Sequence, residues 1–532
     1  YNALATNTVG DRNVAIGEQA LVTLNPATNA DTYNVAVGYD AGNAVTTGIK
    51  NTLVGALAGS ALTDADFNVA MGYLALSVDT LGSGSTALGL QALANQNFTT
   101  ATTSYNTAVG FQAGLSASTG INNTLIGGLT GDALTTGSHN TALGQGALTT
   151  DDLGSHTVAV GYGSLASQNY ATATNSFNTA VGSNSGYAVT TATENTLIGA
   201  SAGDALTTGL ENTAVGYAAL SADRFGKYST AIGNLALNDQ NYATATSSYN
   251  TAVGYRAGLE VTTGIKNTLV GGLVGDALTD ADGNTAVGYF ALTADTLGSA
   301  SVAIGQGTLF AQNFTTATTT YNVAVGYLAG VAVTTGIRNT LIGGLAGDAL
   351  TTSLDNVAIG AHALSTETTG KYSTAVGQGA LFTQNSGSDA SVHNTAVGYN
   401  VGNAITTATH NTLIGSMAGD ALTTGASNVA VGYGALTTDD VGQHNVAIGR
   451  DALSALNIAT AANTYNTAVG SSAGAAMTTG TVNTLIGGLS GLALTSGNSN
   501  VAVGYGALTT DTLGDRNVAI GVSALESQNF TT

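Results

Sequence analysis

Histidine and carboxylate side chains are the groups of this sequence that could bind a metal ion or transfer a proton. The six histidines are His139, His156, His362, His393, His410 and His444. They fall in different coils of the repeat described below, mostly next to the first residue of the repeated motif, whereas a zinc site needs several ligands that converge. We therefore interpret them as solvated turn residues, and we expect no catalytic residue, no metal site and no cofactor.

One acidic residue recurs at a regular spacing. It stands in the sequence Gly-Asp-Ala-Leu every 72 residues, at Asp132, Asp204, Asp276, Asp348 and Asp420. In an assembly of three chains these aspartates could form acidic rings that bind a cation. The alternative is a turn residue, which is favoured because Ser60 and Leu492 replace the aspartate in the first and last copies. Adjacent carboxylates such as Asp151 and Asp152 are also expected in turns, since a catalytic pair must face across a cleft.

Aromatic residues are the best candidates for contact with a ligand. Every fourth repeat is four residues longer than the others, and in these longer repeats two aromatic side chains flank a Thr- and Ala-rich stretch. The candidates are Phe98, Tyr105, Tyr170, Phe177, Tyr242, Tyr249, Phe314 and Tyr321. Exposed rings can stack on sugars, and repetition adds avidity. The alternative, packing against the fold or a neighbouring chain, is favoured because the pattern fades at Ser386 and Ile458.

The composition excludes several classes of protein. Of the 532 residues, 73 are Gly, one is Pro, none is Cys or Trp, and only 8% are charged, against about 25% in an ordinary globular protein. Yet 43% are hydrophobic, which is more than a disordered chain carries. The net charge of −21 opposes binding to nucleic acid or anionic lipid, and no apolar run reaches the roughly 18 residues that span a bilayer. We expect no nucleic-acid partner and no membrane insertion within this sequence.

A five-residue motif repeats along the whole chain. It reads Asn-Thr/Val-Ala/Leu-Val/Ile-Gly, occurs 29 times and advances by 17, 17, 17 and 21 residues, so that four repeats make a 72-residue super-repeat. The fifth position is Gly in all 29 copies, and the first is Asn in 24. The five exceptions share one place in the super-repeat and are Ser85, Thr157, Ser229, Ser301 and Ser373. Regular repetition of this kind predicts stacked structural units.

Each motif is predicted to form a short β-strand, because branched and small residues alternate and the following glycine disfavours a helix. The side chains at the second and fourth positions point one way and the third points the other way. We expect the branched pair to fill the interior of a coil. The small third residue is still apolar, so we expect it to face partner chains.

Two positions of the motif are expected to be structural. The first residue can bond at a turn and stack on its equivalent in the next coil, as a ladder of Asn13, Asn34, Asn51, Asn68, Asn106 and Asn123. The fifth position needs a positive φ or a close approach of two backbones, and it is occupied by Gly17, Gly38, Gly55, Gly72, Gly89 and Gly110.

The predicted fold is an all-β parallel β-solenoid, or β-roll, with 29 coils of 17, 17, 17 and 21 residues. It forms one continuous array over residues 1–532, about 7.4 super-repeats of 72 residues. Neither end carries the atypical capping repeat of a free-standing solenoid. We therefore expect a slice of a longer array, or a unit that stacks end to end into a filament.

Motifs such as Asn13-Val14-Ala15-Ile16-Gly17 resemble the head repeats of trimeric autotransporter adhesins, over essentially the whole chain. The resemblance implies a left-handed parallel β-roll, with three chains wound about one axis, displayed on a bacterial surface and binding host matrix. The sequence Asn-Thr-Ala-Val-Gly-Tyr at residues 284–289 is also similar to repeats of bacteriophage tail fibres. The coils are longer than is usual in the adhesin heads, and the neck, stalk and membrane anchor of that family are absent from this sequence.

These observations favour an extracellular or cell-surface fibre, structural and adhesive, whose partners are other copies of the chain in a homotrimer and a surface glycan or matrix ligand. A bacteriophage tail-fibre shaft, located on the virion tail, is the alternative. A carbohydrate-active β-helix enzyme is a third interpretation. It is disfavoured because no cluster of acidic or basic residues interrupts the repeat.

Overall fold

The structure is a computed structural model that describes residues 1–530 and contains β-strands joined by turns, with no helix in those residues. Contacts group the chain into two units, Tyr1–Lys266 and Asn267–Thr532. Fourteen three-residue strands lie in the first unit, from β2 (Val14–Ile16) to β22 (Thr251–Val253), and fifteen in the described residues of the second, from β23 (Thr268–Val270) to β41 (Val518–Ile520). Each strand corresponds to one motif, which confirms the predicted all-β solenoid.

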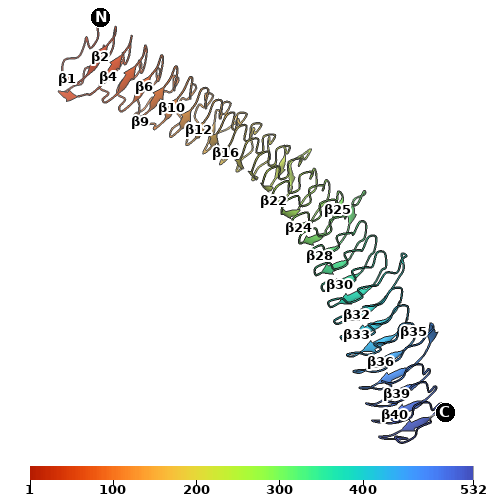
Figure 1. Ribbon diagram of the computed structural model, residues 1–532. Helices are drawn as coiled ribbons and strands as arrows, with labels where there is room; N and C mark the ends of the chain where they lie inside the picture. Colours follow the sequence, from red (N-terminus) through yellow and green to blue (C-terminus); the bar gives the residue numbers. More distant parts are fainter. Residues whose placement is uncertain (531–532) are drawn as a thin grey trace. The chain divides into compact units, whose positions relative to one another are not determined.

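Within each unit, three-residue strands of successive coils pair in parallel (Figure 1). In the first unit β4 (Val35–Val37) lies between β2 and β5 (Thr52–Val54), with Ala36 opposite Ala15 and Leu53. In the second unit β29 (Thr340–Ile342) lies between β28 (Val323–Val325) and β30 (Val357–Ile359) in the same way. Within each unit, equivalent residues of successive coils therefore lie directly opposite one another, whether the step is 17 or 21 residues.

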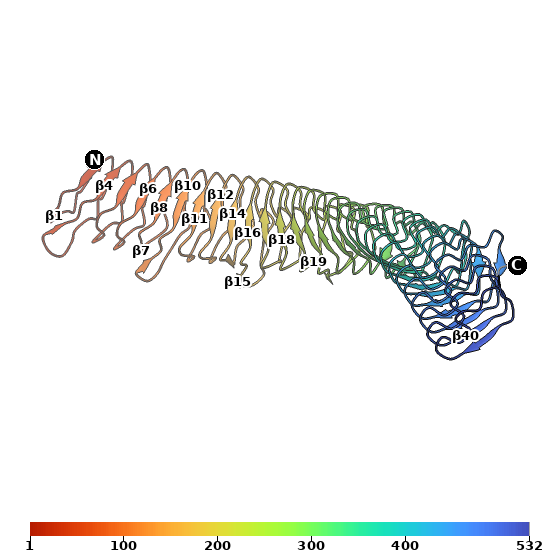
Figure 2. The same cartoon turned by 60° about the horizontal axis from the view of Figure 1, so that its bottom comes forward.

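A second short strand in the longer coils pairs with a short strand of the preceding 17-residue coil. In the first unit β7 (Gly82–Ser83) pairs with β9 (Thr102–Thr103), and β13 (Gly154–Ser155) pairs with β15 (Thr174–Asn175). Figure 2 shows that these short strands and their loops project from one side of the first unit, away from the main sheet. The insertion therefore widens one side of the coil and leaves the main sheet in register.

The two faces of the main strands are the reverse of those predicted from the sequence. The small third residue points into the coil, and Ala36 and Leu53 have no exposed surface. The branched second and fourth residues point outward, so that Ile126 and Ile198 keep 36% and 39% of their surface exposed. The prediction that the branched pair fills the interior was wrong, because side chains from the other sides of the coil already occupy the narrow lumen.

Those lumen side chains also explain why the period is four coils rather than one. The ninth residue of the coil, counted from the motif asparagine, is Gly42 and Gly59 in two coils and Leu76 and Leu93 in the next two. A Cβ added to Gly42 or Gly59 would lie 2.6 Å or 2.8 Å from a methyl group of Leu53. Leucine replaces alanine at the third position of one coil in four, and its side chain fills the space that two glycines leave.

The motif glycine is required by both its conformation and its surroundings. Its φ lies between 126° and 144° in all 29 coils, a region that side-chain-bearing residues avoid. A Cβ on Gly343 would lie 2.6 Å from the carbonyl oxygen of Gly360 in the next coil, whereas the adjacent Gly344 has nothing within 4 Å of such an atom. The predicted structural glycines, Gly17 to Gly110, all belong to this row of close backbone contacts.

Candidate functional site

A buried ladder of asparagines runs beside the main sheet in each unit. The backbone N–H of Asn51 donates to Asn34 Oδ1 over 2.9 Å, and Asn51 Nδ2 donates to the carbonyl oxygen of Ala65 over 2.8 Å. The equivalent bonds extend the ladder through Asn13, Asn68, Asn106 and Asn123. The side chains bond between coils as predicted, although the partner of each Oδ1 is chiefly a backbone N–H rather than another amide.

Where the motif begins with Ser or Thr, a buried glutamine completes the ladder. Gln96 Nε2 donates to Ser85 Oγ over 2.8 Å and to Asp79 Oδ2 over 2.6 Å, and Gln96 Oε1 accepts from Asn106 Nδ2 over 2.9 Å. Asp79 Oδ1 accepts from the backbone N–H of Gly82 over 3.0 Å. All four of these side chains are fully buried. The glutamine amide thus takes the place of the missing asparagine.

The acidic member of this network recurs once in each super-repeat. We call these residues the lumen carboxylates: Asp79, Asp151, Asp223, Asp295, Glu367, Asp439 and Asp511, all without exposed surface. Asp151 Oδ1 accepts a hydrogen bond from the backbone N–H of Gly154 over 2.9 Å, as a turn residue can, but its side chain is buried in the lumen. The signal that could have located them is the constant 72-residue spacing, with a glutamine 17 residues later wherever the next motif begins with Ser or Thr.

Asp439 is a lumen carboxylate without this glutamine. Leu456 occupies the glutamine's place, and the motif begins with Asn445, whose Nδ2 lies 3.4 Å from Asp439 Oδ2. In the coil of Asn13, Leu24 likewise stands at the glutamine's place. Asn517, in the last coil, is the only motif asparagine with a glutamine at that place, Gln528. Ser or Thr with Gln, and Asn with Leu, are therefore two ways to complete the same ladder.

Burial perturbs the acidity of four lumen carboxylates, Asp79, Asp151, Asp223 and Asp439. It raises the pKa of Asp439 to about 6. It also raises the pKa of Asp79, Asp151 and Asp223, where the hydrogen bond from the glutamine opposes the rise. The absence of a strong donor at Asp439 accounts physically for its large shift, because a hydrogen bond to the ionised form is what offsets desolvation.

Four of the eight aromatic candidates lie inside the fold. Phe98, Tyr170, Tyr242 and Phe314 are each at most 6% exposed. The Tyr170 hydroxyl donates to the carbonyl oxygen of Ala192 over 2.6 Å, and the Tyr242 hydroxyl bonds Gly264 in the same way. Their burial contradicts a role in ligand contact: they cover the lumen where the longer coil widens.

The other four aromatics, Tyr105, Phe177, Tyr249 and Tyr321, are 55% to 66% exposed. They belong to the corner row, which we define as the residue immediately before each motif. Every non-glycine residue of this row has a φ between 49° and 63°. Because the conformation is the same in each coil, the corner side chains of successive coils lie one above another.

Neighbouring side chains of the corner row stack. The rings of His139 and His156 are 4.8 Å apart and nearly parallel, and those of Tyr228 and Tyr249 are 5.1 Å apart. Charged members fit the same pattern, with Lys50 Nζ 5.2 Å from the centre of a ring, that of Phe67. Rings at this spacing leave no room for a sugar between them, so the stacked part of the corner row is better suited to holding coils together than to binding.

The remaining candidates, the histidines and Asp132, are spread along the solenoid. Five of the six histidines lie in the corner row, and His362 lies in a turn after its motif. Asp132 Oδ1 accepts a hydrogen bond from Thr149 Oγ1 of the next coil over 2.5 Å, as a turn residue can. Within residues 1–530, no group of three or more His, Cys, Asp or Glu side chains could hold a metal ion.

Comparison with models of protein families and with curated proteins found no match to this chain. In the part of the chain that the structure describes, no helix is long and apolar enough to cross a membrane. The function is therefore argued from the surfaces of the solenoid.

The two forms of the ladder predict a compensated double substitution. Gln96→Leu alone removes three buried hydrogen bonds and leaves Asp79 Oδ2 without its donor, and we expect it to cost about 2–4 kcal/mol of local stability. Adding Ser85→Asn creates the form found at Asn445 and Leu456 and should recover at least half of that loss. Amide hydrogen exchange of residues 79–106 measures the local stability of the single and the double variant. Ser85→Asn alone is the control, and a double variant less stable than Gln96→Leu would contradict the pairing.

The raised pKa of Asp439 predicts that lowering the pH stabilises the fold. Its pKa of about 6 in the folded chain exceeds the ordinary value of 3.8. Protonation of Asp439 therefore stabilises the fold fully below about pH 4, and this stabilisation is lost as the pH rises through 6. The shift corresponds to about 3 kcal/mol. The free energy of unfolding, measured with urea, should differ less between pH 4.5 and pH 7.5 in the Asp439→Asn variant than in the parent. Glu18→Gln, at an exposed site, should leave the difference unchanged, and an equal difference in Asp439→Asn would contradict the assignment.

Proposed function

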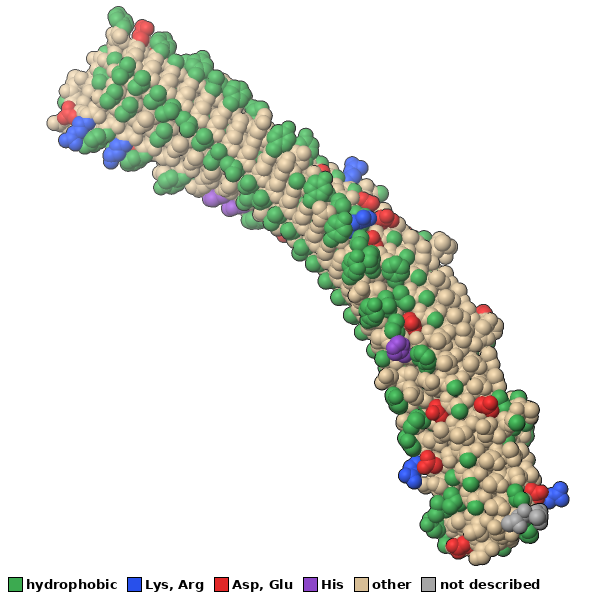
Figure 3. All heavy atoms as spheres, viewed as in Figure 1, with side chains coloured by type: hydrophobic (Ala, Val, Ile, Leu, Met, Phe, Trp, Pro, Cys, Tyr) green, Lys and Arg blue, Asp and Glu red, His purple; other side chains and the backbone are tan. Residues whose placement is uncertain are grey.

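We propose that the protein is an extracellular structural and adhesive fibre, without catalytic activity, whose shaft is assembled from three parallel copies of the chain. The outer face of the main sheet is the observation that supports this most. In all 29 motifs the second residue is Thr or Val and the fourth is Val, Ile, Leu or Met. Figure 3 shows hydrophobic side chains that recur from coil to coil along each unit, with few charged side chains among them.

An apolar face of this extent favours association with another chain. Monomeric proteins rarely expose contiguous apolar patches larger than a few hundred Å², whereas fourth-position residues such as Ile198, Ile304 and Ile414 keep 38% to 40% of their surface exposed. Covering each such residue would contribute about 1 kcal/mol, and the contribution would recur in every coil.

The partner that best fits this face is another copy of the same chain. Its rows of side chains have the same spacing, so the two sets of coils stay matched over any length. The number three is supported by the resemblance of the motifs to the head repeats of trimeric autotransporter adhesins, and so is the location outside the cell. Adhesion would follow from repetition, since many weak contacts along one shaft add avidity.

Charge placed on the outer sheet face should separate the chains without unfolding them. We expect the triple variant Ile126→Asp, Ile198→Asp, Ile232→Asp to sediment at one chain mass, and the parent at three, because buried unpaired carboxylates oppose the interface. Circular dichroism should show that the strands persist.

The matched control is Thr119→Asp, Thr136→Asp, Thr208→Asp. These threonines are exposed on another side of the coil, at a position where other coils carry Asp64 and Asp280. This variant should remain trimeric. A parent chain that sediments as a monomer at micromolar concentration would contradict the trimeric fibre.

A further inference from the structure

A notch opens in the surface of the first unit where two successive coils lack a side chain at their seventh position, counted from the motif asparagine. Gly146 and Gly163 occupy this position, while the coils on either side carry Leu129 and Asn184. The notch has a volume of about 240 Å³, below the roughly 300–1,000 Å³ of sites for drug-sized ligands. Its size therefore suits a single ring rather than an extended ligand.

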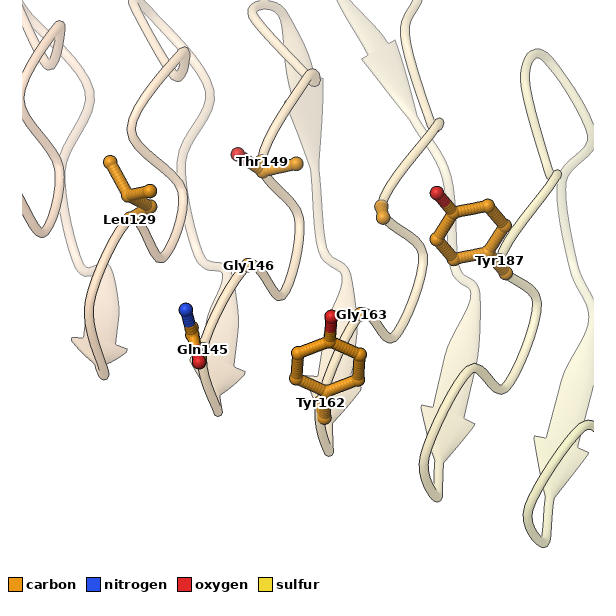
Figure 4. Close-up of a pocket in the computed structure, with 8 residues that line it drawn as sticks. Leu129, Gln145, Gly146, Thr149, Tyr162, Gly163 and Tyr187 are labelled. Carbon is orange, nitrogen blue, oxygen red and sulfur yellow. The ribbon is translucent and has the colours of Figure 1, made fainter.

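The residues around the notch combine aromatic rings with uncharged polar groups. Figure 4 shows Tyr162 and Tyr187 on one side, Gln145 and Leu129 on the other, and Thr149 between them. Tyr162 and Tyr187 are 60% and 49% exposed, and neither ring stacks on another aromatic ring in the described residues. The Tyr187 ring lies against Gly163, with Cδ2 3.5 Å from where a Cβ of that glycine would be. No charged side chain lines the notch.

This chemistry matches a neutral sugar. The apolar face of a pyranose stacks on an aromatic ring, while its hydroxyl groups bond to a side-chain amide and a side-chain hydroxyl. An acidic sugar would lack a cation to pair with, and the net charge of −21 would repel it.

A related combination occurs in the second unit. Gln378 and Gly379 take the sixth and seventh positions of their coil, and Phe382 takes the tenth position of the same coil, whereas Tyr187 takes the tenth position of the coil that follows Gly163. Together with His362 they line a second notch of about 320 Å³. Gln306, Gly307 and Phe310 have the same residue types at the sixth, seventh and tenth positions of another coil. There a methyl group of Leu328 lies 2.6 Å from where a Cβ of Gly307 would be. Asn400, at the seventh position of the next coil, approaches Gly379 in the same way through its amide oxygen, so a polar group lies over Gly379 where a methyl group lies over Gly307.

We propose that the notch at Gly146 and Gly163 is a binding subsite for a neutral pyranose of a surface glycan, and that the notch at Gly379 is its counterpart. The proposal rests on the proposed adhesive function, whose ligand class it names.

The fold offers a substitution that fills the notch without disturbing the coil. Leucine occurs at the seventh position of other coils in the same left-handed conformation, with a φ of 56° at Leu129 against 65° at Gly146. A Cβ on Gly146 would have nothing within 4 Å. Gly146→Leu therefore blocks the first subsite, and Phe382→Ala removes the ring of the second.

Binding is measured by saturation-transfer NMR on the full chain with the methyl glycosides of β-D-glucopyranose, β-D-galactopyranose and α-D-mannopyranose. At least one should give a signal that falls by about half in Gly146→Leu and at least fivefold in the double variant Gly146→Leu, Phe382→Ala. Tyr217→Ala removes an exposed ring outside the notch and should have no effect. Absence of signal from all three glycosides, or an unchanged signal in the double variant, would overturn the proposal.

Two further measurements make the outcome specific. The methyl glycoside of N-acetylneuraminic acid should not bind, and its binding in preference to the neutral sugars would overturn the assignment of ligand class. Sedimentation of the same samples separates this proposal from the trimeric fibre. A trimer that binds none of the glycosides rejects the subsite alone, and a monomer that binds one rejects the trimer alone.

Discussion

The hydrogen bond from the backbone N–H of one motif residue to the asparagine side chain of the preceding coil is the contact on which the coil geometry depends. In the 17-residue coils the buried amide also donates to a carbonyl group 14 residues later in its own coil, as Asn51 does to Ala65 and Asn68 does to Gly82. One side chain therefore fixes the start of a strand, the turn that closes the coil and the height of the next coil. A buried amide without partners would cost several kcal/mol, so a coil that loses its asparagine must replace these bonds. Gln96 and its equivalents do so.

Much of the fold could be predicted because the repeat leaves few choices. A constant step, a glycine in every motif and alternating residue sizes require stacked strands in one register, and the structure has them. Which face of the strand lies inside could not be read from alternation, since both faces of Thr-Ala-Val are apolar. Lumen volume decides it, and that volume depends on residues elsewhere in the coil, such as Gly42 and Gly59 around Leu53.

The corner row shows a second limit of local reasoning. Residues that avoid a positive φ occupy it, including the β-branched Val482 with a φ of 59°. Intrinsic preference alone would exclude this conformation. The surrounding coils impose it, because the Val482 N–H donates to the carbonyl oxygen of Thr464 over 2.7 Å. The candidate aromatics illustrate the same point: their spacing could be found in the sequence, but only packing determines that Phe98 is inside and Tyr105 outside.

The central claim is that the third residue of each motif, Ala or Leu, faces the lumen and the residues at the second and fourth positions face outward. The chain contains no cysteine, so a single introduced thiol reports on its own position. Ala214→Cys and Val215→Cys test adjacent residues of β18 (Thr213–Val215). The account predicts that the thiol at 215 reacts with maleimide in a single chain, or forms a disulfide with a partner chain, while the thiol at 214 stays protected until the coil unfolds. A folded chain in which position 214 reacts and position 215 is protected would contradict it.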